Sequence, residues 1–340
     1  MTAHAPGLEL PASAVPPALL RGAERFVFAA QDARRLAALR IGLFGLLALR
    51  LATNGDYAQV ADQPRAFFDP VSLFEPLPGM PPSELTAIVQ VAGVLLAVVA
   101  AAGLAPRLTF PAAYACALFL NLMLNATGKI IHNDVVLMLC LLALVASPRA
   151  ASRVWALRLR GRWGRIALRL RGRSGPMASG SPRGAAYGWP IRTAMIVIAL
   201  AYLLVGLQKL RYSGLGWITS DNLRWVLYAS SDAQPEPNQL ALFVADRAWL
   251  AHLVAAITVA TEIGFISCLR WARLRWLFVP AAVGLHLGIG LTMRLDYSAQ
   301  ALTVIVVFVN WVVVAEWISG RELWVMPVCR PGPASARRGR

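Results

Sequence analysis

Lysine is almost absent from this chain of 340 residues. Of its 33 basic residues, only Lys129 and Lys209 are lysines, and all the others are arginines. The scarcity matters because arginine stays charged at any accessible pH, whereas a desolvated lysine can lose its proton and act as a base. Lys209 closes a long apolar run, so it is the first candidate for chemistry.

Cysteine and the common catalytic motifs are scarce too. Four cysteines are too few for a disulfide framework, and we expect them to be free thiols. The sequence has no CxxC, HExxH or GxSxG motif and no glycine-rich phosphate loop. Metal and nucleotide chemistry therefore have no positive support, and no metal site is predicted.

Long apolar runs are what the sequence has in abundance. Hydrophobic residues make up 58% of the chain, and its mean hydropathy is +0.57. A membrane-spanning helix needs about 20 predominantly apolar residues. The sequence predicts an all-α integral membrane protein with a bundle of about eight transmembrane helices. These eight runs cover residues 36–53, 85–105, 108–127, 131–147, 191–209, 249–268, 275–293 and 299–318.

The net charge of +16 is distributed unevenly along the chain. Arginines concentrate in residues 1–40, in the basic loop 148–190, around residues 270–275 and in the tail 319–340. With eight spans, a cytoplasmic N-terminus places all these segments on the cytoplasmic side, as the positive-inside rule expects. We therefore predict a multi-pass membrane protein with both termini in the cytoplasm. The expected partners of this charge are lipid headgroups, and no nucleic acid is expected.

This topology divides the chain into an N-terminal cytoplasmic segment, 1–33, a transmembrane domain, 34–318, and a basic cytoplasmic tail, 319–340. Two longer loops, 54–84 and 211–247, then fall on the outer, periplasmic side, where their prolines and aromatic residues predict a lid over the bundle. In the cytoplasmic loop, residues 154–173 fit either an amphipathic surface helix or a plain basic loop.

Polar side chains inside the predicted spans are costly, so each needs an explanation. His132 opens the fourth span, Lys209 ends the fifth on the same helix face as Tyr202, and His286 lies within the seventh. The topology places both histidines and Lys209 in the outer half of the bilayer. We therefore expect that they could line one cavity.

Structural explanations compete with this hypothesis. Lys209 could extend to the outer headgroups, and His132 could simply form hydrogen bonds within the bundle. Gly284 and Gly288 form a small-xxx-small pair that would let the seventh span pack closely without any ligand. Glu262, in the sixth span, is expected to lie deeper toward the cytoplasm and to form a structural hydrogen bond or ion pair.

The order of these residues resembles the HTTM domain, the transmembrane catalytic part of vitamin K-dependent γ-carboxylase and its bacterial homologues. The likeness extends over about residues 34–318. The residues that carry it are Arg40-Ile41-Gly42, Phe68-Asp69-Pro70, His132-Asn133, Tyr202, Gly206-Leu207-Gln208-Lys209-Leu210, Trp217, Glu262 and His286.

The resemblance implies a reaction and its residues. In the carboxylase, a lysine at the corresponding position deprotonates vitamin K hydroquinone, oxygen adds, and the quinone leaves as its epoxide while a glutamate is carboxylated. Lys209 would be the base and His132 its partner. The residues expected to bind the cofactor, a reduced menaquinol-type naphthoquinone, are Tyr202, His286, Asn133 and Trp217. Oxygen would be a co-substrate, and carbon dioxide a second one if carboxylation occurs.

Two departures from the family narrow this expectation. The carboxylase has two consecutive lysines where this chain has Gln208-Lys209. Its large luminal domain, which helps to bind the glutamate-rich substrate, has no counterpart here. Oxidation or epoxidation of the quinol is therefore better supported than protein carboxylation, which would need a small glutamate-containing substrate or a partner protein.

Three classes of function remain after these observations. The leading one is a carboxylase-like membrane oxidoreductase with its active site toward the periplasmic half. The alternative is a non-catalytic quinone- or lipid-binding membrane protein that kept the fold without the reaction. A transporter ranks lowest, because the sequence shows no internal repeat.

Overall fold

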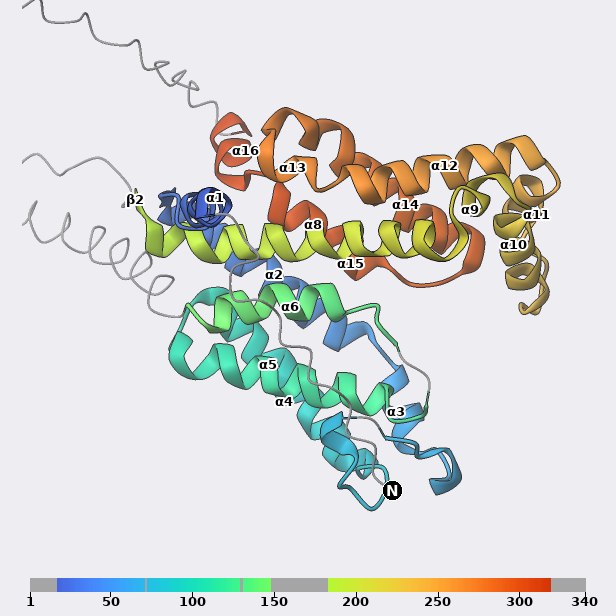
Figure 1. Ribbon diagram of the computed structural model, residues 1–340. Helices are drawn as coiled ribbons and strands as arrows, with labels where there is room; N and C mark the ends of the chain where they lie inside the picture. Colours follow the sequence, from blue (N-terminus) through green and yellow to red (C-terminus); the bar gives the residue numbers. More distant parts are fainter. Residues whose placement is uncertain (1–16, 71, 129–130, 148–182, 319–340) are drawn as a thin grey trace, which may run out of the picture.

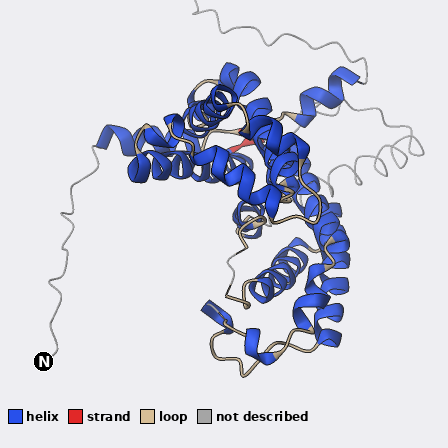
Figure 2. Cartoon of the chain, turned by 90° about the vertical axis from the view of Figure 1, so that its right-hand side faces the viewer, coloured by secondary structure: helices blue, strands red, loops and turns tan. Residues whose placement is uncertain are grey.

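The computed structural model describes residues 17–70, 72–128, 131–147 and 183–318. This part of the chain is almost entirely helical, as the sequence predicts (Figure 1). Its only β-structure in named strands is a small antiparallel pair, β1 (Gln31–Asp32) with β2 (Arg183–Gly184) (Figure 2). The predicted surface helix 154–173, Lys129 and the tail 319–340 lie outside the described residues.

The first half of the chain comprises α1 (Pro17–Val27), α2 (Ala33–Thr53), α3 (Asp56–Ala61), α4 (Ser83–Ala102), α5 (Pro106–Leu124) and α6 (Val135–Val145). The second half comprises α8 (Ala185–Ser213), α9 (Gly216–Thr219), α10 (Asn222–Asp232), α11 (Gln239–Ala245), α12 (Ala248–Gly264), α13 (Ser267–Arg270), α14 (Arg275–Met293), α15 (Ser298–Phe308) and α16 (Trp311–Ile318). The first half contributes α2 to α6, which form one group of helices, and α1, which packs against α8.

Several of these helices fit a multi-pass membrane protein. Five are long and apolar enough to span a bilayer, namely α2, α4, α5, α8 and the segment Ala272–Met293. The pairs α11 and α12, bent by 98°, and α15 and α16, bent by 75°, raise the number to seven if each pair is one span. The predicted fourth span is the short helix α6, so the count of eight stays a prediction.

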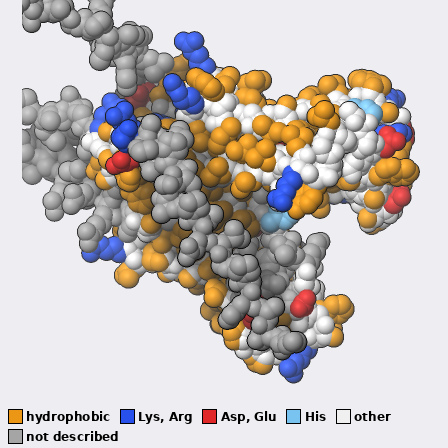
Figure 3. Space-filling model, in the orientation of Figure 1, with side chains coloured by type: hydrophobic (Ala, Val, Ile, Leu, Met, Phe, Trp, Pro, Cys, Tyr) orange, Lys and Arg blue, Asp and Glu red, His pale blue; other side chains and the backbone are white. Residues whose placement is uncertain are grey.

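The two groups of helices lie together at the end that carries α1 and α16 and diverge toward the other end (Figure 1). We call these the α1 end and the α10 end. The long helix α8 connects the groups, because it packs against α2 and α6 on one side and against α12 and α15 on the other. Hydrophobic side chains cover the long helices, while basic ones gather at the α1 end (Figure 3).

The two predicted outer loops contain short helices. Residues 54–84 include α3 and two 3-10 turns, Arg65–Phe67 and Ser72–Phe74. Residues 211–247 fold into α9, α10 and α11, around a small buried cluster of Leu227, Ala241 and Ala245. Asn238 caps α11 by accepting hydrogen bonds from the amides of residues 240 and 241. This second segment therefore forms a folded wall at the α10 end.

Candidate functional site

The candidate site is an apolar cavity of about 660 Å³ between α10, α11, α12 and α14, which we call the main cavity. Its volume is within the usual range for binding sites of small ligands. Its apolar wall consists of Leu223, Val226, Leu227, Leu240, Val244, Val254, Ile257, Ala281, Leu285, Ile289 and Met293. Leu240, Val254 and Ile257 are also exposed on the bundle surface, so the cavity adjoins the face that lipid would contact.

An ion pair lies at the wall of this cavity. Lys209 Nζ on α8 contacts Glu262 Oε1 on α12, and both residues line the cavity. The lysine side chain is 21% exposed and the glutamate side chain 6%. The prediction that Glu262 makes an ion pair is confirmed. The expectation that Glu262 lies deeper than Lys209 is wrong, because the two side chains are in direct contact.

A glycine makes this close approach of α8 and α12 possible. A Cβ atom at Gly206 would lie 2.9 Å from Ile263 Cγ1 and 3.0 Å from Glu262 Cβ. Real Cβ contacts are longer than this, so a side chain here would push the two helices apart. Gly206 precedes Lys209 by one helical turn, and it therefore sets the distance at which the lysine meets Glu262.

The second carboxylate oxygen of Glu262 has no hydrogen-bond partner among the described residues. Glu262 is only 4% exposed, and its Oε2 atom is buried. A buried acceptor without a partner is costly, and most such atoms in native proteins are satisfied by a side chain, a water or a ligand. A hydroxyl group in the main cavity could donate to this oxygen.

The indole ring of Trp217 also contacts the lysine. Lys209 Nζ lies 4.7 Å from the centroid of that ring, which is within the range of a cation–π contact. Trp217 also lines the main cavity, from the short helix α9. Of the six predicted site residues, the cavity thus brings together Lys209 and Trp217, and it adds Glu262 as their charged partner.

Tyr202 and His286 form a separate buried pair. The Tyr202 hydroxyl lies 2.6 Å from His286 Nε2, and the Tyr202 ring stacks on Phe265 with centroids 4.6 Å apart. Neither residue lines the main cavity. His286 lines a second cavity of about 330 Å³, together with Arg294, Tyr297 and other residues.

His132 is connected to the Tyr202–His286 pair through Tyr297, a residue that no sequence pattern indicated. The Tyr297 hydroxyl lies 3.1 Å from His132 Nε2, and the Tyr297 ring stacks on His286 with centroids 5.7 Å apart and planes at 18°. Tyr202, His286, Tyr297 and His132 therefore form a series of four rings, each in contact with the next. The two histidines share this series, but neither lines the cavity that Lys209 lines.

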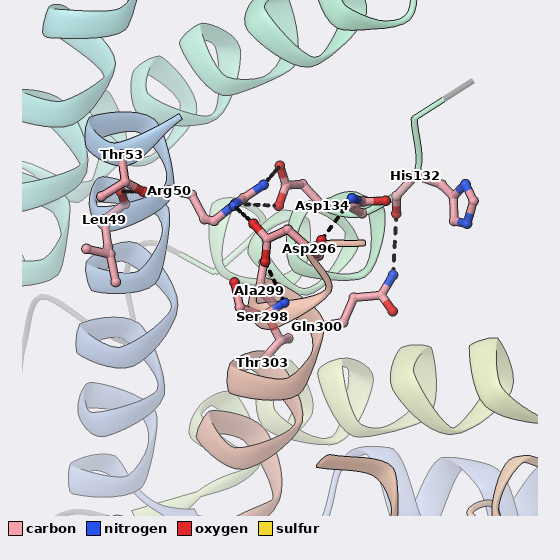
Figure 4. A network of polar contacts seen from close by, with 11 residues as sticks. Leu49, Arg50, Thr53, His132, Asp134, Asp296, Ser298, Ala299, Gln300 and Thr303 are labelled. Atoms are coloured by element: carbon pink, nitrogen blue, oxygen red, sulfur yellow. Dashed lines mark hydrogen bonds and ion pairs between the residues drawn. The ribbon is translucent and has the colours of Figure 1, made fainter. Parts of the chain in front are cut away.

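A polar cluster around Arg50, Asp134 and Asp296 ties the turn after α14 to the start of α6 (Figure 4), and Asn133 contacts it. The Asn133 side-chain amide donates to the Asp296 carbonyl at 2.8 Å. Arg50 on α2 pairs with Asp134 at 3.0 Å and with Asp296 at 2.5 Å. We call Arg50, Asp134 and Asp296 the Arg50 cluster. Asn133 thus has a structural contact here, away from the main cavity.

Asp296 lies in the turn between α14 and α15, beyond the end of either helix. Burial raises the pKa of its carboxyl, but hydrogen bonds from Ser298 and the charge of Arg50 outweigh burial, so this pKa lies below its ordinary value of 3.8. Asp296 is therefore ionised at neutral pH, and the cluster joins α2, α6 and the turn before α15.

Other chemistry finds little support in the part of the chain that the structure describes. No group of three or more histidine, cysteine, aspartate or glutamate side chains there could hold a metal ion. Cys116, Cys140 and Cys268 are free. The arrangement at the main cavity suits an apolar molecule that carries a hydroxyl group, next to a paired base and acid.

Comparison with known proteins gives no family for the chain: no family model, no curated protein and no solved structure matches it.

Proposed function

We propose that this protein is a carboxylase-like membrane oxidoreductase that binds a reduced naphthoquinone in the main cavity and deprotonates it with Lys209. One observation carries the proposal: a lysine–glutamate pair with an unsatisfied carboxylate oxygen lies at the wall of a large apolar cavity. The resemblance of the sequence to the HTTM domain points to the same residue and to the same class of substrate.

The cavity fits both parts of such a substrate. A naphthoquinol has a flat apolar ring system, two hydroxyl groups and an isoprenoid tail. The apolar walls suit the rings and the tail, and the exposed cavity residues Leu240 and Ile257 adjoin the face where lipid would hold the tail. A quinol hydroxyl that donates to Glu262 Oε2 would satisfy the buried acceptor and would bring its oxygen close to Lys209 Nζ.

The ion pair supplies the proton acceptor. When the quinol excludes water, the proton shared by Lys209 Nζ and Glu262 Oε1 can move to the carboxylate, which leaves a neutral amine. The quinol hydroxyl then turns from Glu262 Oε2 to the neutral amine, its O–H bond breaks, the proton goes to Nζ and the electron pair stays on oxygen. Oxygen adds to the resulting anion. In sum, one quinol and one molecule of oxygen give one quinone epoxide and one water.

The partner of Lys209 in this proposal is Glu262 rather than His132. His132 reaches the buried Tyr202 only through His286 and Tyr297. Carboxylation would need carbon dioxide and a glutamate-containing substrate in addition. The proposal keeps the basic α1 end in the cytoplasm and the main cavity in the periplasmic half of a bacterial inner membrane.

A second candidate is a non-catalytic quinone- or lipid-binding protein. The observation that favours it is the pairing of Lys209 itself, because a lysine held by a carboxylate and an indole ring needs no catalytic role. In that case the main cavity would still bind an apolar molecule, but the protein would not convert that molecule chemically.

The test is an epoxidation assay on the purified protein with a reduced naphthoquinone and oxygen. We expect epoxide from the wild type, a loss of about a hundredfold in Lys209→Ala, and no change in Arg211→Ala, whose exposed side chain does not line the cavity. Binding of the quinone without epoxide would favour the non-catalytic candidate. If the protein neither binds the quinone nor forms epoxide, both candidates are ruled out for this ligand.

A further inference from the structure

Three arginines converge at the α1 end of the bundle, far along the chain from one another. Arg35 is in the first turn of α2, Arg192 is in α8, and Arg275 is the first residue of α14. Arg35 and Arg275 lie next to the break between α15 and α16. Arg35 adjoins Ile191, Val307 and Val309, and the Arg275 guanidinium lies 5.9 Å from the Phe308 ring.

These arginines have only neutral contacts in the part of the chain that the structure describes. Arg35 Nη1 donates to Gln31 Oε1 at 2.9 Å, and Arg275 Nε donates to the Cys268 carbonyl at 3.1 Å. Arg192 lies over the Phe26 ring, at 4.5 Å from its centroid.

The nearby carboxylates bind a different arginine. Asp32 and Glu316 each contact Arg34, at 2.8 Å. No ion pair between described residues joins a carboxylate to any of the three converging arginines. The positive charges of Arg192 and Arg275 both act on Arg35, and that of Arg275 acts on Arg192.

Two guanidinium nitrogens in this group are buried and have no hydrogen-bond partner in the described structure, Arg35 Nη2 and Arg192 Nε. Mutually repelling, half-buried cations with unused donors require an anion nearby. Guanidinium groups match phosphate oxygens especially well, because their planar N–H donors can bind two oxygens at once.

The depth of the group in the membrane indicates the source of the anion. Trp271, Trp276 and Trp317 are exposed at this end of the bundle, at 56%, 88% and 71%. Exposed tryptophans mark the headgroup level of a bilayer, where lipid phosphates lie. We propose that Arg35, Arg192 and Arg275 form a binding site for a phosphate group, supplied by the headgroup of an anionic phospholipid.

The proposal can be tested on the full chain in neutral detergent after removal of lipid. Thermal unfolding is followed while phosphatidylglycerol is added in mixed micelles, beside sodium phosphate alone and sodium chloride at the same ionic strength. We expect a saturable rise in Tm with phosphatidylglycerol. If sodium phosphate alone gives that rise, the arginines do form a phosphate site, but its ligand is free phosphate and not a lipid headgroup. No rise in either arm, or an equal rise with chloride, would overturn the site.

Variants locate the effect. Arg192→Gln and Arg275→Gln should each weaken lipid binding about tenfold or more, because a charge-assisted contact is lost. Without lipid they should be at least as stable as the wild type, since repulsion among the three charges falls. Arg273→Gln, exposed and two residues from Arg275, is the matched control and should bind like the wild type. Unchanged binding by both variants, or an equal loss in the control, would refute the assignment.

Discussion

Two groups of paired charges, the Arg50 cluster and the Lys209–Glu262 pair, are built from the same chemistry and arranged differently. In the Arg50 cluster, one guanidinium serves two carboxylates from two other parts of the chain, and the side chains of Arg50 and Asp134 are 15% and 13% exposed. The Lys209–Glu262 pair joins only α8 and α12, and it borders a cavity of about 660 Å³.

This difference indicates what each cluster is for. Arg50 bonds to Asp134 through Nε and Nη2 and to Asp296 through Nη1, so three donors are used within the protein. In the pair, the buried Glu262 Oε2 has no hydrogen-bond partner among the described residues, and Glu262 lines the cavity. A charged group with unused bonding capacity next to an apolar cavity is suited to a ligand, whereas a guanidinium whose three nitrogens all bind carboxylates holds elements together.

The largest effect is expected from removing both members of the pair. In Lys209→Met with Glu262→Leu, epoxide formation should fall at least about a hundredfold, because the proton acceptor is gone. The free energy of unfolding should stay near that of the wild type, since an apolar pair of similar volume often replaces a buried ion pair without loss. Epoxide formation and the free energy of unfolding are measured on the same purified preparation of the double variant.

The single variants are the controls for that result. Lys209→Met alone leaves Glu262 buried without its cation and should lower the free energy of unfolding by about 3 kcal/mol. A double variant as unstable as this single one would show that the pair has a structural role, and our distinction between the two clusters would fail.

The next largest effect concerns the Arg50 cluster. Arg50→Ala leaves Asp134 and Asp296 facing each other without a cation and should lower the free energy of unfolding by about 2–3 kcal/mol. The contribution of Asp296 is the smaller one, because its side chain is 54% exposed and solvent weakens its pairing. Denaturant unfolding in detergent measures the change.

Arg65→Ala is the matched control, because Arg65 is exposed and lies in a short 3-10 turn away from the cluster. Its unfolding free energy should stay within about 0.5 kcal/mol of the wild type. An equally small effect of Arg50→Ala would mean that the cluster contributes little to holding α2, α6 and the turn together.

A smaller effect should come from filling the main cavity. Gly284 lines it, and no atom lies within 4 Å of a Cβ atom placed there, so Gly284→Leu would occupy ligand space without a backbone clash. Quinone affinity should fall about tenfold, the order expected when a few methylene groups compete for an apolar site. Binding is measured by quenching of tryptophan fluorescence.

Gly45→Leu controls for adding a leucine to a membrane helix, because Gly45 also has open space around it and lies on α2, away from the cavity. It should leave quinone affinity unchanged. If Gly284→Leu bound quinone as well as Gly45→Leu does, the ligand would have to lie elsewhere.

Much of the fold could be predicted from the sequence, since most of the long apolar runs became helices near their predicted bounds, although the run 299–318 is broken into α15 and α16. Depth within the membrane was harder to predict. His132 and His286 were expected near Lys209, but which side of a helix a residue faces depends on tertiary contacts, and Tyr297 links the histidines to each other instead. The level of Glu262 relative to Lys209 was wrong because it depends on how α8 and α12 pack against each other, which no local pattern encodes.

The smallest effect we predict is the acid sensitivity of the Arg50 cluster. The folded pKa of Asp296 lies below its ordinary value of 3.8, so the stabilisation is complete above that value and is lost as the pH falls through the folded pKa. Tm should therefore be insensitive to Asp296 between pH 7 and 5 and should fall below about pH 4. Asp296→Asn removes the titrating group, so its Tm should change less than that of the wild type in the acid range. Equal acid profiles of the two proteins would show that Asp296 contributes nothing, and the cluster would then reduce to Arg50 and Asp134 alone.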